Sequence, residues 1–400
     1  MQKSINILMM HNTYQIGGGE DTVFDAEVRL LRAHGVETKT YIRDNAEIAQ
    51  AGLAGKVTTA LNVSWSSRSY DEVLRLIEQH RPDLVHAHNT FPLLTPSIYS
   101  ACSKRRIPVV QTLHNFRLIC PAATLFREGR VCELCLNGGL RNSLIHRCYR
   151  NSFLGTAALY WMLKRNRANS VYDKKITRFI ALTEFAKSKL IQGGLPAERI
   201  VVKPNFVVDP PTAGDGRSGD VVYVGRLSEE KGLRMLLAAW GKVNDVALKI
   251  YGDGPIRGEL EAIAREKNLR VQFFGAVGKS EVIKAMREAI SIIVPSLWYE
   301  GFPMVVLESY ACGTPVLASR IGSLDEVVAE GRTGLKFEAG NPDSIADVVQ
   351  RFVSERGLQK SLRQGARAEF DEKYTAEANV HLLMDIYRSA MNENEIRVSR

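Results

Sequence analysis

The sequence predicts an α/β protein of two domains, each built on a doubly wound parallel β-sheet. Its length of 400 residues suits two domains. In both halves, short apolar segments typical of buried strands alternate with segments of helical periodicity, which favours parallel sheets covered on both faces. A stretch rich in proline and glycine, residues 203–219, separates the two sets and is interpreted as the linker. The expected divisions are 1–205, 206–374 and a final helical segment, 375–400.

The composition is that of an ordinary globular protein, with 45% apolar and 24% charged residues. Residues 1–10 hold only a short apolar run, which is interpreted as a first strand and not as a secretory signal. No stretch reaches the roughly 20 apolar residues that a membrane-spanning helix needs, and the longest candidate is 153–163. We therefore expect a cytoplasmic protein.

The first half begins with a predicted strand, a glycine-rich loop and a helix that starts at Glu20. This order brings backbone amides close to a phosphate or a sugar. The glycines alone are weak evidence, because any tight turn uses glycine, and the loop lacks the complete G-x-G-x-x-G of a simple dinucleotide site. The strands expected here are 5–10, 36–42, 84–87, 108–113 and 178–183, and the helices are 69–80, 96–104 and 184–192.

One histidine, His114, directly follows the predicted strand 108–113. Ligands of open α/β sheets bind beyond the carboxyl ends of the strands, so His114 is a candidate ligand contact. A lone histidine is more often structural, and position is what favours a binding role here.

Residues 115–175 interrupt the alternation and contain four cysteines with the spacing C-x11-C-x2-C-x12-C, namely Cys120, Cys132, Cys135 and Cys148. Two thiolates three residues apart, with two more at a distance, are typical of a structural zinc site, and zinc would fold a loop with little core of its own. An iron–sulfur cluster and four reduced thiols are the alternatives, whereas disulfides are not expected without export.

The positive charge is concentrated in the same region. The whole chain carries +9, and residues 139–178 hold nine basic residues against the single acidic Asp173, a local charge of +8. Because this stretch includes the apolar segment 153–163, we expect it to contact an anionic membrane surface; a solvated face is the alternative. Nucleic-acid binding would suit the charge, but no fold motif for it is present.

The second half repeats the alternation, with strands expected at 221–224, 248–252, 271–275, 291–294 and 314–318. Arg226 and Lys231 flank the turn after the first of these strands and could together neutralise a diphosphate. Pro303 is expected in the first turn of a helix that Gly313 ends. The free N–H groups of that helix start, near Phe302 to Val305, favour an anion.

Two carboxylates lie eight residues apart around this helix start. Glu300 is in the preceding loop, and Glu308 is inside the helix among apolar residues. A charged glutamate in such a run is costly unless something donates hydrogen bonds to it, as a ribose diol would. On spacing alone, a surface carboxylate and an interface salt bridge explain the pair equally well.

Several motifs together resemble retaining glycosyltransferases of the GT4 family over nearly the whole chain. Residues 300–308 match the E-x7-E motif, and 225–232 resemble the G-R-L-x-x-x-K-G segment. Other similar segments are Gly17-Gly18-Gly19-Glu20, Lys203-Pro204-Asn205, Ile250 to Pro255, Phe273-Phe274-Gly275 and Gly331 to Leu335. The segments 86–89 and 112–117 resemble the bacterial branch that builds exopolysaccharides and capsules.

The resemblance implies a GT-B architecture, two Rossmann-like domains facing a cleft, and transfer with retention and no metal cofactor in catalysis. It implies that Arg226 and Lys231 stabilise the diphosphate of a nucleotide sugar, while Glu308 binds the ribose and Glu300 the donor sugar. Other expected donor contacts are Gly301, Phe302, Pro303 and Val305 from the second domain and Gly17, Gly18 and His114 from the first. Of all these residues, Glu300, His114, Arg226 and Lys231 are the expected catalytic ones. His86 and His88 are placed less specifically, near the acceptor.

The expected reaction moves a hexose-type sugar to a lipid-linked glycan acceptor during cell-surface polysaccharide synthesis, at the inner face of the cytoplasmic membrane. Within enzymes, the alternative is a sugar phosphorylase of the same fold that uses phosphate in place of a nucleotide. Outside enzymes, it is a non-catalytic scaffold of a polysaccharide assembly complex. The intact set of Arg226, Lys231, Glu300 and Glu308 favours the enzyme.

Overall fold

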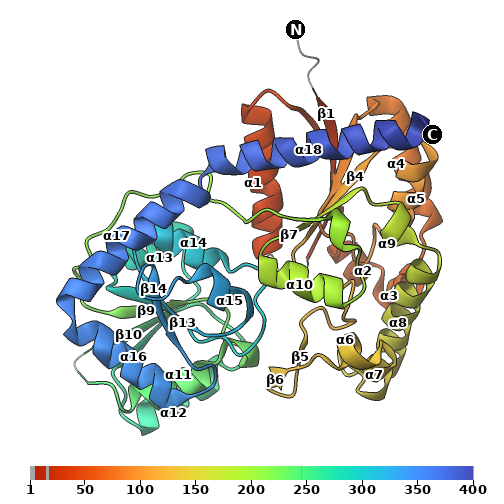
Figure 1. The fold of residues 1–400 in the computed structure, drawn as a ribbon. Helices are drawn as coiled ribbons and strands as arrows, with labels where there is room; N and C mark the ends of the chain where they lie inside the picture. The colour runs from red at the N-terminus through yellow and green to blue at the C-terminus, as the bar shows by residue number, and fades with distance from the viewer. Residues whose placement is uncertain (1–4, 15–17, 245, 400) are drawn as a thin grey trace. The chain divides into compact units, whose positions relative to one another are not determined.

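The computed structural model describes residues 5–14, 18–244 and 246–399, and the chain divides into two compact units (Figure 1). Unit 1 comprises residues 1–125, 132–204 and 379–400, and unit 2 comprises 126–131 and 205–378. Gly17, an expected donor contact, lies outside the described residues.

Unit 1 is built on a six-stranded sheet with the order β2-β1-β3-β4-β7-β8, in which every neighbouring pair is parallel. Its core joins the sheet to α1 and to the last helix, α18, through Ile7, Phe24, Leu31, Leu383 and Tyr387. The strands are β1 (Asn6–Thr13), β2 (Glu37–Asp44), β3 (Leu84–Ala87), β4 (Val109–Leu113), β7 (Arg178–Ala181) and β8 (Ile200–Val202). The helices outside the β4–β7 segment are α1 (Gly19–Ala33), α2 (Ala46–Gln50), α3 (Gly52–Asn62), α4 (Ser67–His80), α5 (Ser97–Lys104), α10 (Glu184–Gln192) and the last helix, α18 (Ala376–Ser399), which belongs to unit 1 from Asn379 onward.

The segment between β4 and β7 contains a short hairpin and four helices instead of a single crossover helix. These elements are β5 (Phe126–Arg127), β6 (Arg130–Val131), α6 (Leu134–Gly138), α7 (Arg141–Ile145), α8 (Phe153–Ala168) and α9 (Val171–Lys174). The apolar stretch of α8 is only partly buried: Leu159, Met162 and Leu163 are buried together with Val63, whereas Leu154 is exposed. Among the described residues, no helix is long and apolar enough to cross a bilayer.

Unit 2 is a second six-stranded parallel sheet with the order β11-β10-β9-β12-β13-β14. The strands are β9 (Val221–Val224), β10 (Leu248–Tyr251), β11 (Val271–Gly275), β12 (Ser291–Val294), β13 (Val316–Ser319) and β14 (Gly334–Phe337), and the helices are α11 (Leu233–Trp240), α12 (Arg257–Glu266), α13 (Lys279–Glu288), α14 (Met304–Ala311), α15 (Gly322–Val327), α16 (Pro342–Ser354) and α17 (Arg356–Lys373). In both sheets the strand order starts inside the sheet and changes direction there, as it does in doubly wound folds. The predicted fold class is therefore confirmed.

Two boundaries differ from the sequence prediction for identifiable reasons. Pro303 is the N-cap of α14 and not a residue of its first turn, since its ψ of 113° is extended. The strand expected from Thr314 begins at Val316, because Thr314 instead bonds the preceding helix ends: its N–H donates to Ser309 O and its Oγ1 to Met286 O. Gly313, with φ of +62°, ends α14 as expected.

Candidate functional site

The predicted donor-site residues of unit 2 gather on two loops that follow β9 and β12. The first loop closes in a 3₁₀ turn, Glu229–Lys231, and Gly232 after it has φ of +74°. A Cβ on Gly232 would lie 2.0 Å from the carbonyl oxygen of Pro295, so only glycine permits this approach. The Leu297 N–H donates to Glu230 O at 2.8 Å and joins the two loops. Lys231 is thereby held against the loop that carries Glu300.

Lys231 and Glu300 form an ion pair, with 2.7 Å between Nζ and Oε1. Ser296 Oγ also donates to Glu300 Oε1, at 2.6 Å, and the Lys231 ammonium lies 5.4 Å from the centre of the Trp298 ring. Burial of Glu300, which is 6% exposed, would raise its pKa, but Lys231 and Ser296 together hold the pKa below its ordinary value. Glu300 is therefore an ionised acceptor that can take further hydrogen bonds from hydroxyl groups.

Arg226 has a different environment from Lys231, although both follow β9. Its side chain is exposed, and among the described residues it forms no ion pair. Its backbone oxygen accepts a hydrogen bond from Tyr223 Oη at 2.8 Å, which fixes the loop on which the side chain is carried. The guanidinium is thus available to an external anion.

The start of α14 has the features of an anion site. No side chain caps the helix after Pro303, so N–H groups of its first turn are left for a ligand or water. The expected donor contacts Gly301, Phe302 and Val305 lie next to this helix start in the sequence. Phe302 is 8% exposed and packs on Tyr374 of the same unit, with 5.9 Å between ring centres, which fixes the approach to the helix.

Glu308 lies on the second turn of α14, where burial raises its pKa and Lys279 only partly opposes the shift. Lys279 Nζ is 3.6 Å from Glu308 Oε1, and the Glu308 side chain is 20% exposed. A carboxylate held in this way gains from hydroxyl donors, which is the environment expected of a ribose-binding group.

In unit 1 the predicted contacts are Gly18 and His114. Gly18 is exposed at the N-cap of α1, and its N–H already donates to Asp21 Oδ2 at 3.0 Å, so it is not a free amide. His114 follows β4, and its Nε2 lies 3.0 Å from Nδ1 of His88, which follows β3. Burial holds the pKa of His114 well below its usual range, so the ring is neutral.

A pocket within unit 1 opens beside His114, at the carboxyl ends of β3 and β4. His88, Asn89 and Asn115 line it together with Glu20. Asn115 Nδ2 donates to Glu20 Oε1 at 2.8 Å, while Glu20 Oε2 has no hydrogen-bond partner among the described residues. Burial raises the pKa of Glu20, and Asn115 opposes the shift. The pocket therefore contains hydrogen-bonding groups suited to hydroxyls.

The predicted zinc site is not supported. Within the described ranges, the only group that brings three potential ligand atoms within 4.8 Å of one another is Glu27, His86 and His88. The four cysteines all carry free thiols, and burial, with added effects of the other three thiols, raises the pKa of Cys135 to about 12. The spacing predicted that the cysteines are metal ligands, but no three of the four sulfur atoms lie as close together as a shared metal ion requires.

Three side chains that contact the predicted site residues or their neighbours were not identified from the sequence. Ser296 stands just after β12, and the rule that strand ends carry binding groups could have found it. Lys279 begins another helix, and Glu27 lies inside α1, where no local pattern marks either as a partner of a site residue. Such partners are defined only by the folded contacts.

Solved structures of other proteins share this fold of two parallel-sheet units. An Anabaena protein, HepE, crystallised with UDP, matches with a TM-score of 0.69 at 17% identity over 96% of this chain and all of that chain. A sucrose-phosphate synthase of Thermosynechococcus elongatus matches with a TM-score of 0.71 at 16% identity over 97% and 100%. The fold is therefore GT-B, the class of two-domain glycosyltransferases.

Sequence families and relatives agree with this class. Residues 16–209 match Glycosyltransferase Family 4, and residues 211–369 match Glycosyl transferases group 1. An uncharacterized glycosyltransferase of Methanocaldococcus jannaschii is 27% identical over 81% of this chain and 80% of its own, and a glycogen synthase of Mycobacterium tuberculosis is 26% identical over 76% and 69%. The protein is thus a glycosyltransferase with a family 4 domain followed by a group 1 domain.

Proposed function

We propose that the protein transfers a hexose-type sugar, with retention, from a nucleotide diphosphate sugar to a lipid-linked glycan in cell-surface polysaccharide synthesis. The observation that carries the donor half of this proposal is the Lys231–Glu300 ion pair beside an arginine without an ion partner among the described residues. Positive charge in excess of what the site itself neutralises suits a ligand with two phosphates. HepE, whose structure contains UDP, gives a precedent for such a ligand on this fold.

The roles follow from the environments of the side chains. Arg226 and Lys231 hold the diphosphate, and the first turn of α14 adds aligned N–H groups. Glu308, a partly buried carboxylate whose burial is only partly compensated by Lys279 at 3.6 Å, accepts from the ribose hydroxyls. Glu300 is kept ionised by Lys231 and Ser296, so it accepts from hydroxyls of the donor sugar.

Catalysis in this proposal is stabilisation of the leaving group. As the bond between the sugar and the diphosphate breaks, negative charge grows on the departing phosphate oxygen, and preformed cations next to it lower the barrier. Lys231 contributes there because Glu300 and Ser296 fix its position before substrate arrives. Same-face attack by the acceptor hydroxyl gives retention; no catalytic metal cofactor is part of the proposal, and no residue is assigned as a nucleophile.

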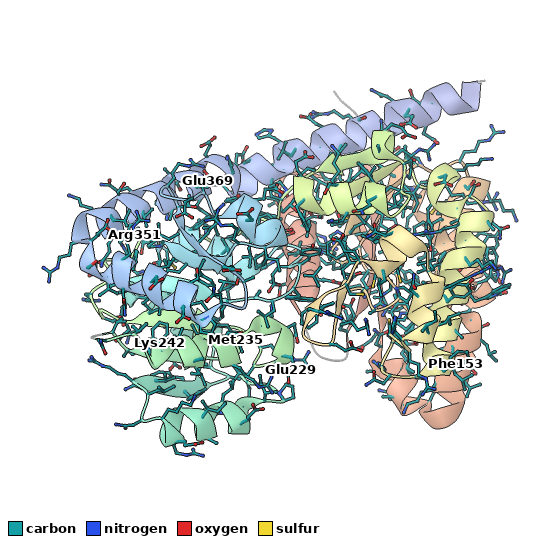
Figure 2. The ribbon with its side chains drawn as sticks, turned by 60° about the horizontal axis from the view of Figure 1, so that its bottom comes forward. Phe153, Glu229, Met235, Lys242, Arg351 and Glu369 are labelled. Atoms are coloured by element: carbon teal, nitrogen blue, oxygen red, sulfur yellow. The ribbon has the colours of Figure 1, made fainter. Side chains whose placement is uncertain are left out.

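The proposed membrane contact rests on one surface of unit 1, the α3–α8 patch. Of the eleven exposed large apolar side chains among the described residues, seven belong to it: Val57, Leu61, Leu134, Ile145, Phe153, Leu154 and Trp161. They lie on α3, α6, α7 and α8, and α8 contacts both α3 and α7 (Figure 1). Phe153 stands at the start of α8 (Figure 2).

The charge of the α3–α8 patch supports an anionic lipid surface as its proposed partner. None of its four helices contains an acidic residue. The exposed basic residues on and beside them are Lys56, Arg141, Arg147, Arg150, Lys164 and Arg165. Apolar side chains that insert and basic ones that pair with headgroups are the two parts of an interfacial membrane contact. A lipid-linked acceptor would be reached from such a surface.

The donor half is tested with a panel of nucleotide diphosphate sugars. We expect one of them to raise the melting temperature and to be slowly hydrolysed without acceptor, since a ligand of the folded state stabilises it. Phosphate-dependent breakdown of a disaccharide would identify the phosphorylase instead. Absence of any donor binding would contradict the enzyme and leave the scaffold.

A further inference from the structure

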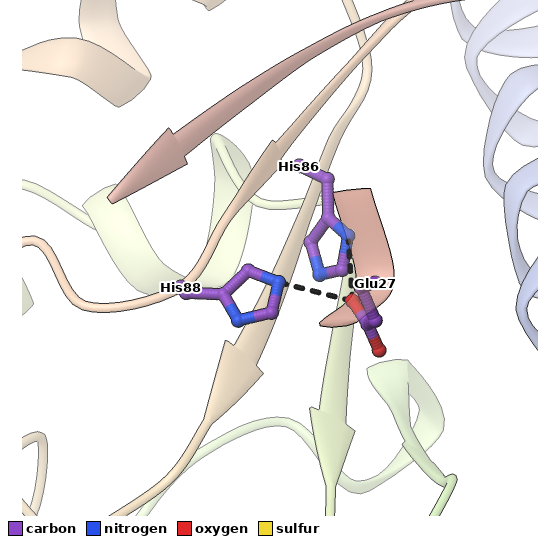
Figure 3. Close-up of side chains that lie close together, drawn as sticks. All are labelled: Glu27, His86 and His88. Atoms are coloured by element: carbon purple, nitrogen blue, oxygen red, sulfur yellow. Dashed lines mark ion pairs between the residues drawn. The ribbon is translucent and has the colours of Figure 1, made fainter. Parts of the chain in front are cut away.

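Several of the most deeply buried ionisable groups of unit 1 form a cluster that the proposed reaction does not use. Glu27 on α1 is 0% exposed, and so are His86 and Lys203. Lys203 Nζ lies 2.6 Å from Glu27 Oε1 and donates also to Asn379 Oδ1 at 3.1 Å. The other carboxylate oxygen, Oε2, faces two histidines: it is 3.1 Å from His88 Nε2 and 3.7 Å from His86 Nδ1 (Figure 3).

The cluster is not arranged for a metal ion. The Lys203 ammonium already neutralises Glu27 at hydrogen-bond distance. Both ring nitrogens of His86 are engaged, Nδ1 with Tyr387 Oη at 2.7 Å and Nε2 with Thr112 Oγ1 at 2.8 Å. A cation placed among these groups would meet a fixed positive charge and histidines whose lone pairs are not free.

The contacts instead form a chain that ends at His114. A carboxylate 3.1 Å from His88 Nε2 repels a lone pair there and attracts a proton, although the N–H does not point straight at the oxygen. With its proton on Nε2, the neutral His88 has a lone pair on Nδ1. His114 Nε2, 3.0 Å from that lone pair, must then carry its own proton and donate it. His114 Nδ1 is left without a proton.

We propose that Glu27 is a positioning residue that, through His88, fixes the tautomer of His114 so that Nδ1 is presented as a hydrogen-bond acceptor for a hydroxyl of the donor sugar. The hydroxyl contact rests on the role of His114 in the proposed function, whereas the tautomer does not. His114 lines the unit 1 pocket, and its Nδ1 makes no hydrogen bond among the described residues, so this acceptor is left for a ligand or water.

Lys203 explains how the Glu27 carboxylate can fix the tautomers while the histidines stay neutral. Burial would raise the pKa of Glu27, but Lys203 in the first place, then His88 and His86, hold it well below its usual range. Burial lowers the pKa of His88, so that ring stays neutral beside the compensated carboxylate. A neutral imidazole has one donor and one acceptor, and only in that state does fixing one nitrogen define the other.

The tautomer is measured directly by NMR of the full chain labelled with ¹⁵N-histidine. The chain has eight histidines, and the spectrum of His114→Asn assigns the signal of His114. We expect His114 to show a protonated Nε2 and an unprotonated Nδ1. A proton on Nδ1 of His114 would overturn the proposal, whether or not the protein transfers sugar.

The variant Glu27→Gln/Lys203→Met removes the carboxylate and its counter-charge together, which avoids leaving a buried lysine unpaired. We expect His114 to populate both tautomers in this variant, and kcat/KM for the donor to fall in proportion to the fraction that keeps Nδ1 unprotonated, about twofold for an equal mixture. An unchanged tautomer overturns the positioning role. A changed tautomer with unchanged kcat/KM overturns the sugar contact while leaving the network intact.

Glu369→Gln is the matched control, since Glu369 of unit 2 is also buried, at 4% exposure, and pairs with Arg332 and Lys373 (Figure 2). It should lower stability without changing the His114 signal. If the double variant does not fold, the tautomer of His114 in the parent protein and in His88→Phe decides the same point. His88→Phe removes the link, so His114 should lose its single tautomer.

Discussion

Lys231 Nζ lies 2.7 Å from Glu300 Oε1, and the two residues come from loops after different strands of the same sheet. Gly232 makes this contact possible because it lets the first loop approach the Pro295 carbonyl. The pair combines a cation for a phosphate with an acceptor for a hydroxyl. One residue of the pair cannot be changed without altering the other, and this coupling shapes how substitutions must be interpreted.

Lys231→Ala should lower kcat at saturating acceptor by at least about tenfold, because a cation next to the leaving group is lost. It should also destabilise the fold by about 1–3 kcal/mol, because Glu300 remains buried without its partner. Lys231→Ala/Glu300→Gln removes the unpaired charge and should recover stability but not turnover. Turnover near the parent level in either variant would contradict the assignment.

The same pair gives a pH dependence of stability. The pKa of Glu300 is held below its ordinary value in the folded state. The pair therefore contributes fully to the free energy of unfolding above the pKa of the unfolded state, about 4.3, and this contribution is lost as the pH falls through the lower pKa of the folded state. Melting curves of the parent and of Lys231→Ala/Glu300→Gln should therefore converge in acid. A difference that stays constant at low pH would be inconsistent with the ionised pair.

Arg226→Ala should weaken binding of a nucleoside diphosphate about tenfold, the effect of one charge-assisted hydrogen bond. Its melting temperature should match that of the parent, because the side chain forms no ion pair among the described residues. Calorimetric titration with the nucleoside diphosphate measures the affinity. Arg234→Ala is the control: this arginine of the same unit is engaged by Glu259 and Glu229 and should not affect binding.

Glu308→Gln should be more stable than the parent near pH 7 and yet bind donor more weakly. Burial raises the pKa of Glu308, so the folded state prefers the protonated form, and its contribution is fully present below about pH 4.3 and is lost as the pH rises through the folded pKa. Glutamine resembles the protonated form at every pH. The stability gain should vanish in acid; a gain that persists there would have another cause.

The parallel sheets could be predicted because their strands are short, apolar and buried on both faces, as the fully buried β3, β4 and β12 show. The site residues carried by strand ends were predictable for the same topological reason: Arg226, Glu300 and His114 all follow strands. Pro303 and Thr314 show where local rules fail: Pro303 is extended and only caps α14, and Thr314 donates a hydrogen bond to the α13 residue Met286 instead of starting the strand.

The partners of the site residues could not be predicted, because they come from elements distant in sequence. The ring nitrogens of His86 lie at hydrogen-bond distance from Thr112 and Tyr387, the latter 301 positions away. Glu27 and Lys203 are 176 positions apart. The cysteine spacing predicted a metal site that is not supported: among the described residues, no three of the four sulfur atoms come within the 4.8 Å that a shared metal ion would need.

The α3–α8 patch makes the proposed membrane contact testable. Leu154→Glu/Trp161→Glu places charge on two of its exposed side chains, which are 79% and 56% exposed, so the fold should tolerate it. Cosedimentation with vesicles that contain anionic lipid should fall strongly, because the inserted apolar area is lost and like charge faces the headgroups. Raising the salt concentration should weaken binding of the parent, since the basic side chains contribute through screened charge.

Leu382→Glu controls for a new charge elsewhere on unit 1, because this side chain is 42% exposed on α18 and outside the α3–α8 patch. It should cosediment like the parent. Equal loss in both variants would mean that net charge and not this surface determines binding. Equal binding of the parent to neutral and anionic vesicles would contradict the role of its basic residues. Donor hydrolysis in solution should be the same in all three proteins, since the patch belongs to unit 1 and the proposed diphosphate and ribose contacts belong to unit 2.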